Sequence, residues 1–293
     1  MKKYKFRILG AFVLILLNFL FSGYGNRKVH PNLNMTIVER FQSKFITSLV
    51  PLERFKNYTF ALSSSVKYSG NEIIEGGLLR NNIVEKKSEK NPVQWIMHGG
   101  LSADEPEIFA SFRHFYDPTL AEGNRYLHDH LDYLTGHDNP KIDIIEWTLS
   151  HAEHQYNWEN GKAAVANALN CSDEVCKSEE MGFAYRALGE TLHMIADLGC
   201  PAHVRDDSHA TEPFTGAQVG SYDPYEEIFE ELSDINVHFG KGVVDPNLKD
   251  YFLKAKTVKD ISIKLATYTN AHFFTAQTIS GKDVKPLIHP EKT

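Results

Sequence analysis

The sequence predicts an all-α protein built from several helices. Long segments place apolar side chains three or four residues apart, the spacing of a helix with a buried face, at residues 35–50, 181–198 and 258–279. One short run, Tyr58–Leu62, could form a strand. Helices therefore account for most of the predicted core.

Length and composition are those of an ordinary globular protein. The chain has 293 residues, of which 42% are apolar and 24% are charged, and this length suits one large domain or two small ones. The formal net charge of -7 argues against a protein that binds nucleic acid through many phosphate contacts, although a nuclease is compatible with it. The 14 histidines supply many metal ligands.

The amino terminus predicts a signal peptide. Met1–Arg7 is basic and precedes an almost wholly apolar run, Ile8–Phe21. This run is too short for a comfortable membrane span, and small residues that suit cleavage follow it. We expect residues 1–23 to be a bacterial-type signal peptide and residues 24–293 to be one domain of a secreted or periplasmic protein. An uncleaved anchor is the alternative.

Two cysteines agree with export. Cys171 and Cys176 are five residues apart, and they could close a small surface disulfide in an oxidising compartment. Cys200 is the remaining cysteine. We interpret it as a packing residue rather than as a metal ligand.

Local signals divide the first half of the chain. Pro51 ends the first helix, because proline cannot continue a helix. The charged run Glu85–Lys90 predicts a solvated loop. Asn139-Pro140 announces a helix over residues 141–158, which the pair Asn160-Gly161 is expected to break.

The second half continues the helical pattern. Asp223-Pro224 opens a helix, since proline suits the first turn. The other expected elements are a short helix at 163–169, the longest helix at 181–198, a loop at 205–222, and closing helices at 249–255 and 258–279.

The longest helix carries the strongest metal-binding signal. His193 and Asp197 are four residues apart, which places both side chains on one helix face. Pro201 ends the helix, and His203 follows closely. Imidazole and carboxylate both suit zinc, although a lone pair of this kind also occurs on surface helices. Because the helix is apolar enough to be buried, metal coordination would explain its polar side chains.

Other histidines and acids could complete the ligand set. Asp104 and His114 lie among aromatic residues that would shield them from water, although each residue alone could be a cap or a surface group. His151 and His154 are three residues apart on the predicted helix at 141–158. We interpret this second pair as structural, because nothing nearby completes a ligand set.

Several segments together resemble the zinc-dependent phospholipase C family, which is related in fold to the S1/P1 nucleases. The segments fall in the family's order and span roughly residues 29–49 and 95–235. They are Val29–Asn34, Arg113-His-Phe-Tyr-Asp-Pro118, Ala152-Glu-His-Gln-Tyr-Asn-Trp158, and the signature that runs from Tyr185 through His193 to Pro201-Ala-His203.

The resemblance implies an all-helical fold with three zinc ions in a cleft. By position, the first zinc would take Asp104, His114, His193 and Asp197. Asp197 would bridge to a second zinc, which His30 and the mature amino terminus near Tyr24 would also hold. The third zinc would take His203, Glu226 and one further residue. The family often has a histidine at the position of Tyr222, so another residue must supply this ligand, and we favour His209 over Asp223.

The resemblance also implies the reaction. Adjacent zinc ions polarise phosphoryl oxygens and activate water, and Asp104 is the expected general base. The expected activity is phospholipase C: hydrolysis of a phospholipid at a membrane surface, by a monomer, to diacylglycerol and a phosphorylated head group. Glu105 stands where choline-preferring relatives have an aromatic residue, so the head group stays open.

Two other functions are compatible with the same residues. One is a zinc nuclease of the S1/P1 type, which would share the metal cluster and differ in its pocket. The other is a binding protein in which zinc stabilises the fold without turnover, and its zinc ions would be fully ligated by protein.

Overall fold

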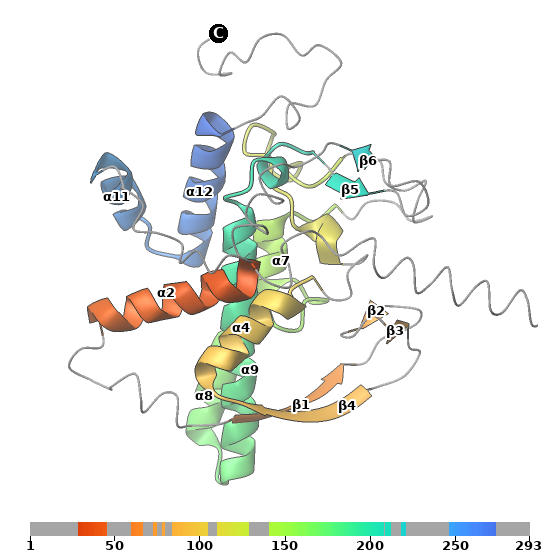
Figure 1. Cartoon of the computed structure of the whole chain (residues 1–293), viewed down its shortest axis with the longest axis vertical. Coiled ribbons are helices and arrows are strands. Elements are labelled where there is room, and N and C mark those ends of the chain that lie inside the picture. Colours follow the sequence, from red (N-terminus) through yellow and green to blue (C-terminus); the bar gives the residue numbers. More distant parts are fainter. Residues whose placement is uncertain are drawn as a thin grey trace, which may run out of the picture.

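Helices dominate the parts of the chain that the computed structural model describes. Those parts are residues 29–45, 60–66, 73–74, 78–79, 84–104, 110–128, 141–207, 209–211, 218–220 and 246–273. Within them lie seven α-helices: α2 (Val29–Phe45), α4 (Pro92–Ser102), α7 (Ile144–Ser150), α8 (Trp158–Asn170), α9 (Glu174–Asp197), α11 (Pro246–Leu253) and α12 (Val258–His272). The prediction of a mainly helical protein is confirmed for this part of the chain (Figure 1).

The strands form only small antiparallel pairs in the described ranges. β1 (Phe60–Val66) pairs with β4 (Val84–Lys90), β2 (Ile73–Ile74) with β3 (Leu78–Leu79), and β5 (His209–Thr211) with β6 (Gln218–Gly220). The strand expected near Tyr58–Leu62 is confirmed in part, because β1 begins at Phe60. The loop predicted for Glu85–Lys90 was wrong, since this segment pairs with β1 as an antiparallel strand. β5 and β6 likewise interrupt the loop expected at 205–222.

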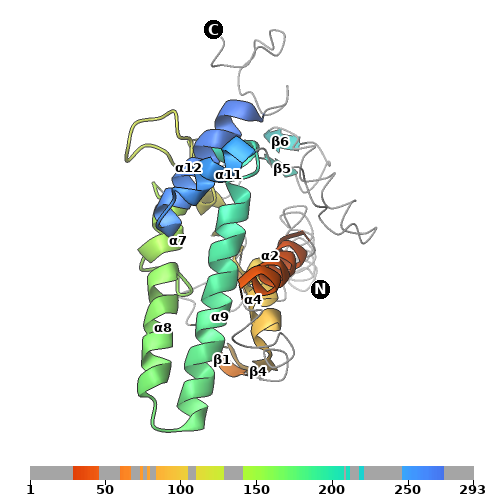
Figure 2. The same ribbon diagram turned by 90° about the vertical axis from the view of Figure 1, so that its left-hand side faces the viewer.

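Helix α9 is the axis of the structure. Figure 2 shows α8 running beside it as the other half of a helical hairpin, with α2 and α4 on its other side. α4 and α8 make its most extensive contacts, and α2, α7 and α12 also touch it. Asp173 caps the start of α9 by accepting from the Cys176 backbone N–H. The predicted longest helix is therefore confirmed, with one additional amino-terminal segment from Glu174.

Glycines let the helices around α9 approach closely. A Cβ at Gly189 of α9 would lie 2.2 Å from the carbonyl oxygen of Ile96 in α4, and one at Gly99 would lie 2.3 Å from the Arg186 carbonyl oxygen. A Cβ at Gly161 of α8 would lie 2.8 Å from the Ala187 Cβ. The backbones of α4 and α8 therefore contact α9 at positions where no larger residue fits.

The segment at 141–158 differs from the predicted single helix. α7 ends at Ser150, where His151 adopts an extended conformation, and α8 starts only at Trp158 because Asn157 caps it. Gly161 lies inside α8 rather than ending a helix. It faces α9, where the contact with Ala187 requires a residue without a side chain. The short helix expected at 163–169 is the continuation of α8.

The closing helices are confirmed with shifted bounds. α11 starts earlier than expected, and α12 ends at His272, where Phe273 is extended. α12 packs with α7 and α9 around a core that contains Trp147, Met194 and Ala266. In α2, the helix begins before the predicted Met35. The helix expected from Asp223-Pro224 lies outside the described residues.

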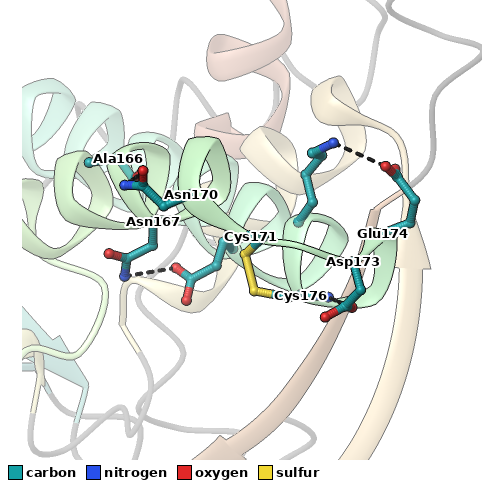
Figure 3. The surroundings of a disulfide bond; sticks show 9 residues. Ala166, Asn167, Asn170, Cys171, Asp173, Glu174 and Cys176 are labelled. Carbon is teal, nitrogen blue, oxygen red and sulfur yellow. Dashed lines mark hydrogen bonds and ion pairs between the residues drawn. A yellow bond between two sulfur atoms is a disulfide. The ribbon is translucent and has the colours of Figure 1, made fainter.

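The predicted disulfide is confirmed. Cys171 and Cys176 are bonded, with Cα atoms 5.7 Å apart, across the turn between α8 and α9 (Figure 3). Cys200 is buried and lies outside this bond. Residues 1–23 lie outside the described ranges, and among the helices that are described none has the length and apolar character needed to cross a bilayer.

Candidate metal centre

Five of the eight predicted ligands come together from four parts of the chain. His30 is in the first turn of α2, and Asp104 lies just beyond the end of α4. His114 follows a 3-10 turn at Ser111–Arg113, while His193 and Asp197 are one turn apart near the end of α9. Except for His30, which is partly exposed, all of these residues are buried.

The carboxylates and imidazoles face one another at short range. Asp197 Oδ2 lies 2.9 Å from His114 Nδ1 and 3.3 Å from His193 Nε2. Asp197 Oδ1 lies 3.2 Å from His30 Nε2. Asp104 approaches with Oδ1 at 3.2 Å from His114 Nδ1 and Oδ2 at 3.4 Å from His193 Nε2. Asp197 is thus the residue that touches all three histidines.

The hydrogen bonding of His193 aims its Nε2 at this cluster. Its Nδ1 lies 2.8 Å from the Gly100 carbonyl oxygen, which can only accept, so Nδ1 carries the proton and donates. Nε2 is then the ring nitrogen that a metal ion would bind, and it faces the carboxylate oxygens of Asp104 and Asp197. Nε2 of His193, Oδ2 of Asp104 and Oδ2 of Asp197 are buried and lack a hydrogen bond of acceptable geometry. A cation among these atoms would satisfy all three at once.

The charges in the cluster shift one another strongly. Burial raises the pKa of the Asp197 carboxyl, but His193, His203 and His30 outweigh burial and hold that pKa well below its usual value. Burial likewise raises the pKa of Asp104, and His193 and His114 again lower it overall. Burial lowers the pKa of His193, yet Asp197 and Asp104 hold it well above the usual value. The two carboxylates are therefore ionised and attract a positive charge.

Two overlapping triads in the described residues could bind a metal ion. One consists of His30, His193 and Asp197, and the other of Asp104, His114 and His193. The ligand atoms of each triad lie within 4.8 Å of one another. Nitrogen and oxygen donors of this kind suit zinc among the first-row metals.

Asn34 holds the helix of His30 in place. Asn34 is fully buried one turn after His30, and its Nδ2 donates to the carbonyl oxygens of Ile96 in α4 and Gly189 in α9, both at 3.0 Å. A Cβ at Gly100 would come within 2.7 Å of this amide nitrogen. The contact therefore needs glycine at position 100, and it fixes α2 against both helices that carry ligands.

His203 lies beside the cluster but belongs to neither triad. Its Nδ1 donates to the His114 carbonyl oxygen at 2.7 Å, and its ring stacks on Phe115 with centroids 4.8 Å apart. The rings of His203 and His114 are 6.4 Å apart. This separation agrees with a ligand of a neighbouring metal ion rather than of the ion that His114 would hold. The side chain of His209, together with Tyr24, Tyr222, Asp223 and Glu226, lies outside the described residues.

The interpretation of His154 as structural agrees with its contacts. The ring is buried, stacks on Trp147, and faces the Trp147 carbonyl oxygen and the Glu190 carboxylate. Sequence reasoning did not single out Glu190, Asn34 or the Gly100 carbonyl as supports of the centre. The sequence offered two signals for these supports. One is a glutamate in a helix that is apolar enough to be buried, and the other is the pair of adjacent glycines at 99 and 100, near the end of α4.

Comparison with protein-family models, curated proteins and solved structures gave no match. The geometry of the His and Asp cluster therefore carries the functional argument.

Proposed function

We propose that the protein is an exported, zinc-dependent phosphodiesterase that hydrolyses phospholipids to diacylglycerol and a phosphorylated head group. The observation that carries the metal dependence is the convergence of Asp104, His193 and Asp197, whose buried ligand atoms face one another. The resemblance of the motifs to the zinc-dependent phospholipase C family supports the substrate class. The disulfide supports export, because disulfides persist in oxidising compartments.

The residues divide into holding and proton-accepting roles. His30, His114 and His193 would hold zinc together with Asp197, which reaches toward both triads. His203, Glu226 and His209 are the proposed ligands of a third ion. Zinc bound there would supply Lewis acidity toward the phosphoryl oxygens.

Asp104 is the proposed general base. Its carboxylate is buried, and its pKa is lowered by His193 and His114 against the effect of burial, so it is ionised and able to accept a proton. Oδ1 contacts His114, while Oδ2 lacks a hydrogen bond of acceptable geometry. A water molecule between this oxygen and the substrate phosphorus would be within reach of a proton acceptor.

The test is a metal count and a substrate screen on the full-length secreted form. We expect close to three zinc ions per chain and hydrolysis of phospholipid vesicles that chelation abolishes and zinc restores. A single-stranded DNA substrate in parallel distinguishes the nuclease. No zinc, or activity that survives complete chelation, would contradict the proposal, and zinc without any turnover would indicate the binding protein.

The matched variants are two histidine substitutions. His193→Ala should remove hydrolysis and zinc together, because His193 belongs to both triads. His272→Ala is the control, since His272 is an exposed residue at the end of α12. Equal loss in both variants would indicate a general effect on folding.

A further inference from the structure

A second buried polar cluster lies next to the metal centre and is centred on Glu190. This residue is 3% exposed and lies on α9, three residues before His193. Its Oε1 accepts from Ser102 Oγ at 2.7 Å and from Arg186 Nε at 2.9 Å, and its Oε2 lies 3.0 Å from His154 Nε2. The three partners come from α4, from α9 and from the turn between α7 and α8. One carboxylate therefore joins three parts of the structure.

The groups around the Glu190 carboxylate hold it in one position. His154 Nδ1 faces the Trp147 carbonyl oxygen at 2.8 Å, which only accepts, while Nε2 faces the Glu190 carboxylate. Nδ1 therefore donates to this carbonyl, and the two contacts together hold the ring in one orientation. Arg186 adds a positive charge beside Glu190 and lies 3.9 Å above the Tyr156 ring. Hydrogen bonds to charged groups are stronger than neutral ones, so this cluster resists displacement.

Ser102 connects the Glu190 carboxylate to the metal centre. It is the last residue of α4 and is 1% exposed. The proposed ligand Asp104 lies two residues after it, and Gly100, which accepts from His193 Nδ1, lies two residues before it. The hydroxyl of Ser102 is therefore bound to Glu190 of α9 at a position midway between Gly100, which accepts from His193, and Asp104, which faces the cluster.

A merely structural contact would not require charge at this position. Burying a carboxylate has a desolvation cost that a packed apolar side chain avoids. Helices α4 and α9 are already held together at Gly99 and Gly189, where their backbones touch. What the carboxylate adds is a directional bond at the end of α4, just before the chain leaves the helix.

We propose that Glu190 is a positioning residue, which acts through Ser102 to set the end of α4 so that Asp104 and His193 face the same metal ion. Arg186 and His154 hold Glu190 in turn. This inference rests on the metal site of the proposed function. Groups that orient metal ligands in this way commonly contribute ten- to a hundredfold to metal affinity.

The test measures zinc affinity in full-length variants by competition with a chromophoric chelator, after the metal has been removed. Ser102→Ala deletes only the hydroxyl that links α4 to Glu190, and we expect it to weaken zinc binding about tenfold or more. Ser262→Ala is the matched control, because Ser262 is also buried and its hydroxyl binds Val258 within α12. The Tm of each metal-free variant is recorded alongside.

A conservative variant tests the same link from the other side. Glu190→Gln keeps an oxygen that can accept from Ser102 and an amide that can face His154 Nε2, so zinc affinity should stay closer to wild type than in Glu190→Ala. Unchanged zinc affinity in Ser102→Ala would overturn the inference alone, as would equal weakening in Ser262→Ala. A wild-type protein that binds no zinc would overturn the inference together with the proposed function.

Discussion

The two ends of helix α9 differ in almost every physical respect. At its carboxyl end, His193 and Asp197 are buried, at 1% and 3% exposure, among other charged groups. At its amino end, Val175 is 60% exposed, and Leu169, near the end of the neighbouring helix α8, is 82% exposed. Charge is buried at one end and apolar surface is exposed at the other, which reverses the usual distribution. The two ends are separated by about 30 Å of helix.

The difference shows how one helix combines stability with function. A covalent bond between Cys171 and Cys176 closes the amino end. The carboxyl end relies on crossing glycines, buried hydrogen bonds and the attraction of its carboxylates for positive charge. Substitutions at the carboxyl end should therefore affect activity most, and substitutions at the amino end should affect only stability.

The largest effect is expected from Asp197→Asn. The amide keeps the shape of the side chain but removes the charge that faces His30, His114 and His193. Zinc content and phospholipid hydrolysis should fall together, with the rate reduced by more than about 100-fold, beyond the effect of outer partners. Asp250→Asn on the exposed surface of α11 is the control. Normal zinc content in Asp197→Asn would show that the carboxyl end is not a metal site.

Gly189→Ala should be the most destabilising change in the packing of α9. Its Cβ would lie 2.2 Å from the Ile96 carbonyl oxygen, so α4 must move. We expect the free energy of unfolding to fall by about 3 kcal/mol, as for other overpacked sites. Gly123→Ala serves as a comparison, because it has a positive φ but no atom within 4 Å of the new Cβ. Equal losses measured by urea denaturation would rule out the close helix crossing as the cause.

Acid should destabilise the carboxyl end through Glu190. Burial raises the pKa of this carboxyl, but Arg186 and His154 lower it overall from 4.5 to about 2. A depressed folded-state pKa gives stability that is present above about pH 4.5 and is lost as the pH falls toward 2, on the order of 3 kcal/mol in total. Urea denaturation of the metal-free protein across this range measures it. Glu190→Gln should show a flatter dependence, and an equally steep one would exclude Glu190 as the source.

Removal of the disulfide should have the smallest effect on function. Cys171 and Cys176 are separated by five positions, and closing so small a loop contributes about 2 kcal/mol by the chain-entropy estimate. The double variant Cys171→Ser and Cys176→Ser should therefore have a lower Tm with unchanged zinc content and unchanged hydrolysis. A loss of zinc in this variant would show that the two ends of α9 are coupled.

The sequence predicted those features that depend on local spacing. The four-residue step from His193 to Asp197 and the apolar periodicity of α9 and α12 are local, and the structure has them. The five-residue step between Cys171 and Cys176 is also local, and the disulfide forms.

Features that depend on contacts between distant segments were missed. The pair Asn160-Gly161 predicts the end of a helix, yet Gly161 is a contact point between α8 and α9. Glu85–Lys90 reads as a loop, yet β1 pairs with it. The link from Glu190 to Ser102 joins residues 88 positions apart, and no spacing rule indicates such a pair. The resemblance, by contrast, named His30, Asp104 and His114 from distant segments, and the structure brings all three beside His193.

Anomalous scattering from crystals of the zinc-loaded protein, recorded on both sides of the zinc absorption edge, tests the metal centre most directly. We predict a zinc peak about 2.0–2.1 Å from His193 Nε2, in the space that Asp104 and Asp197 face. An electron-density map that shows these side chains in place with no anomalous peak between them would contradict the metal centre.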